Sequence, residues 1–364
     1  MTAEQHQVLD DPVQRARLDP GDMLGAVYGL PEQCREAWDG ARAFELPWKE
    51  APRRIVILGM GGSAIAGDYF RALLSLEAPV RVFNVRAYDL PSFADEETLV
   101  IASSFSGETE ETLSAFEQAF ATPARKLAIT TGGRLLTMAR ANGVPAFTFA
   151  YHGEPRAAIG WGLMPLLAVA EKLGLMQGVE ADVQEAIAVL TSLREEYVAE
   201  TASSQNPAKQ LAVRLHERLP VVYGAGALIE VGRRWKTQLN ESAKVWAFFE
   251  ELPEAQHNAI VGLALPKAIA GAATAVLLPS DRLDHPRVAL RYDLMRRLLA
   301  DAGIDAIEAP GRGKSALAQM LSLTLLCDYA ATYLALLYGT DPTPTTVIDE
   351  LKASLAKAEW AASS

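Results

Sequence analysis

Hydroxyl groups gather where an apolar run of the sequence ends. The segment "TLVIASSFSGETEETL" (98–113) places Ser104, Ser106 and Thr109 close together, with Gly107 among them. Hydroxyl donors beside the free N–H groups of a helix N-terminus can hold an anion without any positive charge. The alternative is that these side chains only cap the helix that follows, but a helix needs just one capping residue. The cluster therefore favours an anion-binding loop over caps alone.

A second loop offers related chemistry nearer the N-terminus. The segment "RRIVILGMGGSAIAGDYF" (53–70) predicts a buried strand, a turn and a helix, and the turn contains Gly61, Gly62 and Ser63. In a doubly wound parallel sheet, adjacent strands present the loops at their carboxyl ends to one crevice. We expect the two loops to bind one terminal phosphomonoester, because a nucleoside triphosphate would also require a lysine and Mg²⁺ ligands.

Alternating strand and helix patterns position these loops, which is typical of a parallel sheet covered on both faces. Further strands are predicted at "VRVFNV", "TLVIASS", "KLAITTGG" and "AFTFA". The plan of strand, Gly-x-Gly and helix then returns in "LPVVYGAGALIEVGRRWKTQL" (219–239), with later strands at "KVWAFFEEL", "ATAVLLPS" and "DAIEAP". The second copy lacks the hydroxyl cluster. We therefore expect the first copy to bind the ligand and the second to complete the site.

A dinucleotide site is the main alternative for the glycine turn. "GMGGSA" fits G-x-G-x-x-A, but a site for NAD also needs an acid near the end of the second strand. That position offers Asn84 and Arg86 instead, and Arg86 leaves only a weak case for NADP. A second glycine-rich segment, "GRGKS", does not match a P-loop, because Glu308 stands where its first glycine belongs.

Several segments together resemble one known family. "SSFSGETEETL" resembles the Ser-x-Ser-Gly-x-Thr-x-Glu-Thr motif of the sugar isomerase (SIS) domain, which binds the phosphate of phosphosugars. "GMGGSAIAGD", "NESAKVWAFFEELPEAQHNAIVG" and "DPTPTTVIDELK" resemble the bifunctional phosphoglucose/phosphomannose isomerases. The resemblance extends from about Leu24 to the last predicted helix.

The resemblance implies an α/β fold with two SIS-type doubly wound parallel-sheet domains in tandem. It also implies a helical N-terminal arm and a C-terminal helix. The boundaries that we predict are 1–50 for the arm, 51–175 for the first SIS domain with the phosphate loop, 176–205 for a helical linker, 206–340 for the second SIS domain and 341–364 for the C-terminal helix.

The family resemblance also implies roles for four residues in aldose–ketose isomerisation, which moves a proton between C1 and C2 through an enediolate. Glu241 in "QLNESAK" matches the base, although Ser242 stands where the family commonly has Asn. His257 in "PEAQHNAIVG" matches a histidine that helps to open the sugar ring and crosses from the partner subunit of a homodimer. Lys352 in "VIDELK" matches a lysine that acts at the ring oxygen or O1.

The fourth residue is Arg156 in "GEPRAAIG", which matches the family's Pro-Arg motif. A fixed guanidinium suits an enediolate and the sugar hydroxyls. The alternatives are structural in each case: an ion pair of Arg156 with Glu154, a surface glutamate, a structural histidine and a solvated lysine. The Thr-rich segment before Lys352 is where we expect tolerance for both C2 epimers, through Thr343 or Thr345. The chemistry needs no metal and no cofactor.

Composition narrows the classes of partner and compartment. The chain has 364 residues with a formal net charge of −11 and no block of basic residues, which argues against a nucleic-acid partner. Cys34 and Cys327 lie far apart, as in proteins of a reducing compartment, and the polar N-terminus is unlike a signal peptide. The apolar segment 320–339 could span a bilayer, but Asp328 in its middle favours a helix buried in protein. We expect a cytoplasmic protein with no membrane partner.

Other functions remain open at this level. SIS domains also serve as non-catalytic phosphosugar sensors in regulators, although no helix-turn-helix segment is evident here. An isomerase of another phosphosugar is a further possibility. A glutamine-dependent synthase would need a cysteine after the initiator methionine, where this chain has Thr2. An NAD(P) oxidoreductase would have to bind a nicotinamide cofactor.

Overall fold

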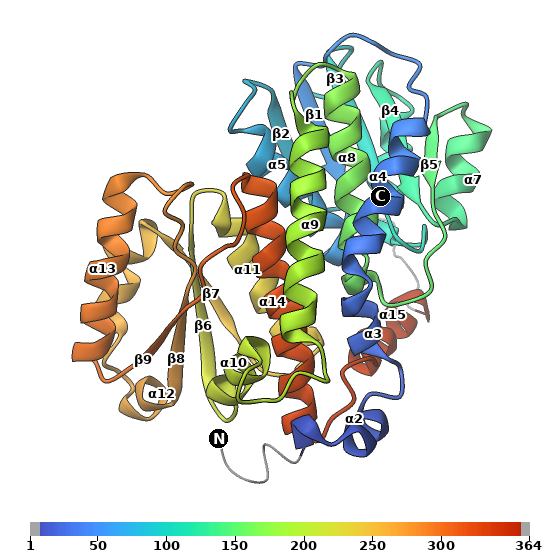
Figure 1. Cartoon of the computed structure of the whole chain (residues 1–364). Helices are drawn as coiled ribbons and strands as arrows, with labels where there is room; N and C mark the ends of the chain where they lie inside the picture. The colour runs from blue at the N-terminus through green and yellow to red at the C-terminus, as the bar shows by residue number, and fades with distance from the viewer. Residues whose placement is uncertain (1–7, 358–364) are drawn as a thin grey trace.

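Two parallel β-sheets, one in each lobe of the molecule, carry the helices and loops of the chain (Figure 1). The computed structural model describes residues 8–357. The first sheet has strand order β2-β1-β3-β4-β5, and all of its strand pairs are parallel. The strands are β1 (Arg54–Leu58), β2 (Arg81–Val85), β3 (Thr98–Ser103), β4 (Arg125–Thr130) and β5 (Ala146–Thr148). This order has its topological switch point between β1 and β3, from whose carboxyl ends the two candidate phosphate loops leave.

The second sheet repeats this plan with four strands. Its order is β7-β6-β8-β9, again entirely parallel, which matches the order of β2, β1, β3 and β4 in the first sheet. The strands are β6 (Leu219–Ala225), β7 (Phe248–Leu252), β8 (Ala273–Leu277) and β9 (Asp305–Glu308). The predicted class, two doubly wound α/β units in tandem, is therefore confirmed.

One face of each sheet contributes to a single hydrophobic core around the central helices. Ile57 of β1 and Val222 of β6 both belong to it. In Figure 1 these helices lie between the two sheets and over the first one. They are α4 (Leu30–Ala43), α5 (Gly61–Leu74), α8 (Ile159–Lys172), α9 (Val179–Tyr197), α10 (Pro207–Leu215), α11 (Leu228–Glu241) and α14 (Ala316–Leu337).

The opposite face of each sheet has a smaller core of its own. Val56 of β1 packs with Phe116 of α6 (Glu110–Ala119), a helix that shares this layer with α7 (Gly133–Ala141). Tyr223 of β6 packs with Tyr292 of α13 (Pro286–Asp301). Successive residues of a strand point to opposite faces, so burial on both faces produces the unbroken apolar runs seen in the sequence.

Helix α14 is long and apolar enough to cross a membrane by length and composition. Within the protein, however, 89% of its most apolar window is buried, and it packs against α9, α10 and α11. Asp328 near its middle forms an ion pair of 2.8 Å with Arg234 of α11. The prediction that this segment is a helix buried in protein is confirmed.

The central helices α5 and α11 run antiparallel, which matters for the site. Arg71 in the last turn of α5 pairs with Glu230 in the first turn of α11. At the other end, Gly62 in the first turn of α5 lies so close to Pro155 that an added Cβ would be 2.8 Å from the Pro155 carbonyl oxygen. The next residue, Arg156, hydrogen-bonds to Ser242, which immediately follows α11. The start of α5 therefore lies beside the end of α11.

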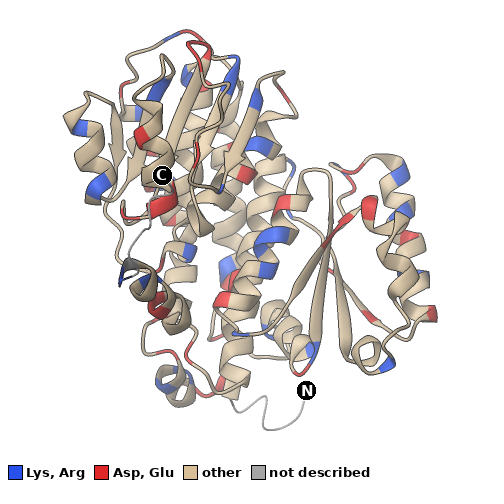
Figure 2. Ribbon diagram, turned by 180° about the vertical axis from the view of Figure 1, so that it is seen from behind, with Lys and Arg blue, Asp and Glu red and all other residues tan. Residues whose placement is uncertain are grey.

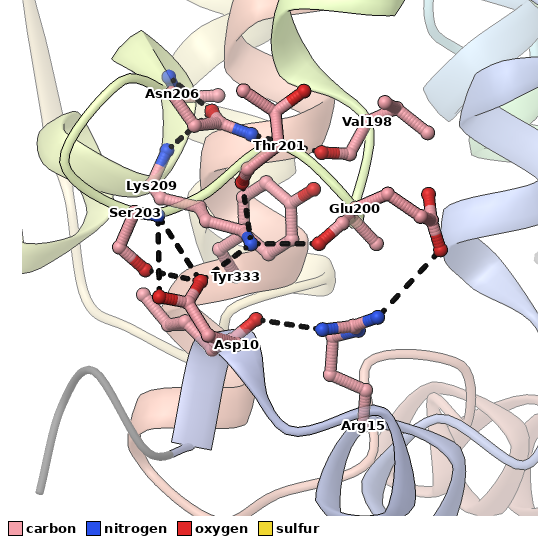
Figure 3. Close-up of polar contacts among 12 residues, drawn as sticks. Asp10, Arg15, Val198, Glu200, Thr201, Ser203, Asn206, Lys209 and Tyr333 are labelled. Carbon is pink, nitrogen blue, oxygen red and sulfur yellow. Dashed lines mark hydrogen bonds and ion pairs between the residues drawn. The ribbon is translucent and has the colours of Figure 1, made fainter.

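A buried lysine fastens the N-terminal segment to the second lobe (Figure 3). The Lys209 ammonium, fully buried on α10, donates to the Asp10 carboxylate at 2.9 Å and to the carbonyls of Ala199 and Thr201 at 2.8 and 2.9 Å. The Ser203 hydroxyl donates to the same carboxylate at 2.6 Å. Burial lowers the pKa of Lys209, and Asp10 opposes that effect. A buried ammonium with three acceptors gives this junction a defined geometry.

Shorter elements complete the described chain. The N-terminal arm contains α2 (Pro12–Leu18) and α3 (Met23–Tyr28) ahead of α4. After β5 come the 3-10 turns η1 (Pro155–Ala157), η2 (Glu254–His257) and η3 (Ala259–Gly262), and the helices α12 (Lys267–Ala272) and α15 (Thr346–Lys357). Seen from behind, basic and acidic positions are interspersed over both lobes (Figure 2). Residues 358–364 of the predicted C-terminal helix lie outside the described part.

Candidate functional site

The loop after β3 is folded around its own hydroxyl groups. The Ser104 hydroxyl lies 2.9 Å from the Thr109 hydroxyl and accepts the Gly107 N–H at 3.1 Å. The Ser106 hydroxyl accepts the Glu108 N–H at 3.2 Å. Thr109 occupies the N-cap position of α6, but its side chain makes no capping bond. Capping alone therefore does not explain the cluster, and the Ser104–Thr109 pair keeps one hydroxyl hydrogen for a ligand.

Two glycines set the backbone of this region. Gly107 has φ of +71°, and an added Cβ would lie 2.0 Å from the carbonyl oxygen of Gly132, so only glycine fits. At the start of α5, Met60 provides no side-chain cap. Among the residues that the structure describes, the N–H groups of Gly61 and Gly62 have no backbone or side-chain acceptor. These groups are free to bind an anion at the helix N-terminus.

Nearby acids are held by other groups. The Glu108 carboxylate accepts the Arg134 N–H at 2.8 Å, and Glu110 accepts the hydroxyl of Tyr88. That hydrogen bond to Glu110 is the largest factor that raises the pKa of Tyr88 to about 12. Both carboxylates are thus engaged in protein contacts, which reduces their repulsion of an anion in the loop.

The two predicted phosphate loops meet, as the switch point requires. Ser63 of the first loop and Ser103, which precedes the second, line one cavity of about 10 Å³. That volume holds about one water molecule. Pro155 and Gly62 line the same cavity, so the loops also adjoin η1.

Arg156 joins three elements that are far apart in the sequence. It is buried, and its guanidinium donates to the Ser242 hydroxyl at 3.2 Å and to the carbonyls of Pro342 and Thr343 at 2.8 and 2.6 Å. It also pairs with Glu154 at 2.9 Å, so the ion pair considered as an alternative exists alongside these bonds. Four of the five N–H donors are occupied. Arg156 therefore holds the end of α11 and the segment 342–343 together, and one of its N–H groups remains available to a ligand.

Glu241 is the last residue of α11, beside the contacts of Arg156. Its side chain is partly exposed, and among residues 8–357 its carboxylate has no hydrogen bond or ion pair. Ser242, next in sequence, is buried and accepts the bond from Arg156, so this position is more than a neutral replacement for Asn. The sequence showed this departure but could not show that contact.

Lys244 is a residue that the sequence interpretation left without a role. Its φ is +60°, and its ammonium donates to the carbonyls of Glu241, Pro342 and Pro344 at 2.5, 3.1 and 2.6 Å. Burial, followed by the nearby Arg156, lowers the pKa of Lys244. Lys244 is the last residue of the "NESAK" segment, whose resemblance to the family motif could have indicated that this lysine has a role at the site. Together with Arg156 it connects the end of α11 to the residues that lead into α15.

Lys352 lies on the exposed helix α15, whose start follows these contacts directly. The hydroxyl of Thr343 is buried without a hydrogen-bond partner in the described chain, and it packs against Gly21 of the N-terminal arm. Thr343 is therefore turned toward the arm, which leaves Thr345 as the candidate for the C2 pocket. Residues 342–344, which Arg156 and Lys244 hold against the end of α11, lead directly into α15 and so set the position of Lys352 relative to Glu241.

His257 lies in the second lobe at the end of η2, where it is exposed and has no hydrogen bond among residues 8–357. Unusually exposed apolar side chains surround it in the sequence: Trp246 (74%), Val261 (87%), Leu265 (71%) and Ile269 (53%). Within residues 8–357, no hydrogen bond or ion pair connects His257 with the candidate phosphate loops. An exposed apolar surface of this kind is typical of a protein–protein contact.

The alternative of a dinucleotide site meets a structural obstacle. Asn84 donates to Asp68 of α5 at 2.6 Å, and Arg86 forms an ion pair with the other oxygen of the same carboxylate. The Asp68 carboxylate is buried. The groups that would have to bind a ribose or its 2′-phosphate are therefore engaged in packing β2 against α5.

In the corresponding loop of the second lobe, the serine hydroxyl is used by hydrogen bonds within the protein. The Ser280 hydroxyl accepts the N–H groups of Arg282 and Leu283, and it donates to Gln319 at 2.7 Å. Asp284 accepts the Ser280 N–H at 2.8 Å, and burial raises its pKa to about 6. This arrangement agrees with the expectation that the first copy carries the anion loop.

Comparison with known proteins identifies the relatives of this chain. A family model described as "SIS domain" matches residues 50–140, and one described as "Bacterial phospho-glucose isomerase C-terminal SIS domain" matches residues 204–355. The bifunctional phosphoglucose/phosphomannose isomerase of Caldicellulosiruptor bescii is 42% identical, over 92% of this chain and 99% of that protein. The enzyme of the same name from Aquifex aeolicus is 36% identical, over 83% and 90%.

Solved structures agree with the fold. A hypothetical protein from Thermus thermophilus superposes with a TM-score of 0.71 at 20% identity, over 98% of this chain and 94% of the other. At that identity the likeness concerns the fold alone. The matches with the two sequence relatives extend over nearly the whole length of each relative, and both identities exceed 30%. The chain therefore belongs to the bifunctional phosphoglucose/phosphomannose isomerase family of phosphosugar isomerases.

Proposed function

We propose that this protein interconverts glucose 6-phosphate and mannose 6-phosphate with fructose 6-phosphate. One observation carries the proposal. Arg156 contacts the end of α11 and the segment before α15, while its neighbour Pro155 touches Gly62 at the start of α5. The phosphate loops, Glu241 and the base of the Lys352 helix therefore share one region.

The substrate phosphate is anchored by neutral groups. Ser104, Ser106 and Thr109 supply hydroxyls, and Gly61 and Gly62 supply N–H groups at the start of α5. Ser63 lies in the same helical turn. Helix N-termini and neutral donors are sufficient for one phosphomonoester. Lysine and arginine side chains then remain for the sugar end.

Proton transfer falls to Glu241. The carboxylate removes the proton from C2 of the open-chain aldose and returns it to C1, through an enediolate. Lys352 acts at O1 or the ring oxygen, and the remaining N–H of Arg156 stabilises negative charge that develops on the substrate oxygens. A pocket that accepts either configuration at C2 allows both epimers. No redox cofactor is needed, because no electrons leave the substrate. Arg156 and Lys352 supply the positive charge near the developing oxyanion, so the mechanism requires no metal ion.

The site becomes complete in a homodimer. His257 is exposed at the end of η2, and the adjoining segment that begins with η3 exposes the apolar side chains of Val261 and Leu265, which a partner subunit would cover. In the dimer His257 reaches the partner's site and assists opening of the sugar ring.

A steady-state assay with both aldose phosphates tests the base. Glu241→Gln keeps the size of the side chain but cannot accept the proton, so we expect kcat to fall by about 10²- to 10⁴-fold. The matched control is Glu117→Gln, the same change on the exposed face of α6. Wild-type turnover in Glu241→Gln would exclude this base. Phosphosugar binding without turnover by the wild type would favour a regulatory SIS protein.

Mixing two inactive variants tests the dimer. If His257 acts across the interface, a heterodimer of Glu241→Gln and His257→Ala contains one intact site, made from the unmutated residues. Random reassociation of equal amounts would restore about a quarter of wild-type activity, because half of the dimers are mixed and each has one active site. If His257 acted within its own chain, mixing would restore nothing.

A further inference from the structure

Asp328 is a charged residue in the middle of an otherwise apolar helix. It is 4% exposed, and both of its carboxylate oxygens are used. Gln238 donates to one oxygen at 2.6 Å and Arg234 donates to the other at 2.8 Å. Burial raises the pKa of Asp328, and Arg234 opposes that effect. Both partners lie on α11, within about two turns of Glu241.

Arg234 extends this pair to the main chain of the site. The Nη2 that pairs with Asp328 also donates to the carbonyl oxygen of Arg156 at 3.0 Å. The Nε–H of Arg234 is buried and has no hydrogen-bond partner in the described chain. A buried ion pair with an unsatisfied donor adds little to stability compared with apolar packing. The arrangement is better explained by a role in fixing the position of the Arg156 main chain.

Arg156 is consequently held at both ends. Arg234 fixes its carbonyl from inside the core, and its own guanidinium holds Ser242 and the Pro342–Thr343 segment. A continuous path of hydrogen bonds therefore runs from α14 through α11 and η1 to the start of α15.

We propose that the Arg234–Asp328 pair positions Arg156, and through it the end of α11 and the base of α15, for catalysis. The proposal rests on the proposed function, since it assigns a role at the same site. Neither residue touches the substrate: both are positioning residues. Among residues 8–357, no hydrogen bond or ion pair joins the phosphate loops to this pair, so we expect substrate anchoring to change little when the pair is broken.

Two variants separate positioning from simple destabilisation. Asp328→Asn keeps the shape of the side chain but leaves Arg234 without a charged partner. Arg234→Lys keeps the positive charge, but its side chain is one bond shorter. Its ammonium therefore cannot occupy the Nη2 position from which Arg234 reaches both Asp328 and the Arg156 carbonyl. We expect both to lower kcat by about tenfold or more, with KM for fructose 6-phosphate nearly unchanged.

The matched control is Lys209→Met, which breaks the buried Lys209–Asp10 pair of Figure 3. It removes a comparable ion pair, and within residues 8–357 Lys209 makes no hydrogen bond or ion pair with Arg156 or Ser242. Kinetics are measured well below the unfolding temperature of each variant, so that only folded protein is compared. We expect Lys209→Met to lose stability but to keep kcat.

Backbone hydrogen exchange supplies a readout that does not depend on activity. We expect faster exchange of the amides around Arg156 and of Thr343, Thr345 and Thr346 in Asp328→Asn, but not in Lys209→Met. Wild-type kcat in Arg234→Lys, or an equal loss of kcat in Lys209→Met, would overturn the proposal. If the wild type shows no isomerisation, the proposed function fails. The positioning role would still be tested independently, because unchanged hydrogen exchange around Arg156 in Asp328→Asn, compared with the wild type, would overturn it.

Discussion

Replacing Gly107 by alanine tests whether the loop after β3 grips the substrate. Gly107 has φ of +71°, and an added Cβ would lie 2.0 Å from the Gly132 carbonyl oxygen. Real Cβ atoms essentially never approach another heavy atom closer than 3.0 Å. The left-handed backbone alone costs roughly 1–2 kcal/mol for alanine. The loop must in addition move away from Gly132 by about 1 Å, which adds about 1–3 kcal/mol by overpacking.

Gly143→Ala is the matched control for this substitution. Gly143 has a similar φ of +64°, but an added Cβ there meets no atom within 4 Å. It therefore carries only the backbone cost. A displacement of 1 Å in a substrate-positioning group can cost about 100-fold in rate. We expect kcat/KM of Gly107→Ala to fall by about that factor, and kcat/KM of Gly143→Ala to stay at the wild-type level.

Steady-state kinetics with fructose 6-phosphate and urea unfolding measure the two effects separately. Inhibition by inorganic phosphate should weaken in Gly107→Ala, because the displaced loop binds the anion less well. The reasoning would be refuted if Gly107→Ala lost stability as calculated but kept both kcat/KM and phosphate inhibition. The loop would then be structural only.

Substitutions at three further positions give distinct outcomes. Ser242→Ala leaves the buried Nε–H of Arg156 without an acceptor and should cost about 1–3 kcal/mol of stability, whereas Ser242→Asn should keep activity. Ser104→Ala should raise KM, measured by steady-state kinetics, because the Gly107 N–H loses its side-chain acceptor. Burial raises the pKa of Asp284 from 3.8 to about 6 in the folded state. Between these two pH values, Asp284 is protonated in the folded protein but ionised in the unfolded chain. Wild-type stability should therefore fall as pH rises from about 4 to 6, and Asp284→Asn, followed by urea unfolding, should remove about 1–3 kcal/mol of that dependence.

Much of the fold could be predicted because strands buried on both faces leave continuous apolar runs. All nine strands of residues 8–357 coincide with predicted segments, and the repeat of the Gly-x-Gly turn predicted the second sheet. The meeting of the two candidate phosphate loops was also predictable. Each follows directly from a strand, and the switch point of a doubly wound sheet brings such loops together.

The remaining features of the site depend on contacts between distant parts of the chain. Arg156 meets Ser242 and Pro342 from 86 and 186 positions away, and no local pattern encodes those bonds. The role of Lys244 was missed for the same reason. Asp328 was noticed as an oddity in an apolar helix, but only packing showed that its partner Arg234 holds the main chain of Arg156.

The sequence by itself determined the α/β class, the tandem repeat and the two glycine- and hydroxyl-rich loops, because each depends on residues close in the chain. Tertiary structure decided how the repeats are combined. Helices α5 and α11 pack antiparallel, so the first lobe contributes the start of a helix and the second contributes the end of one. That orientation, set by packing around α14, brings the end of α11 with Glu241 to η1 and the glycine turn that begins α5, and leaves His257 exposed on the second lobe.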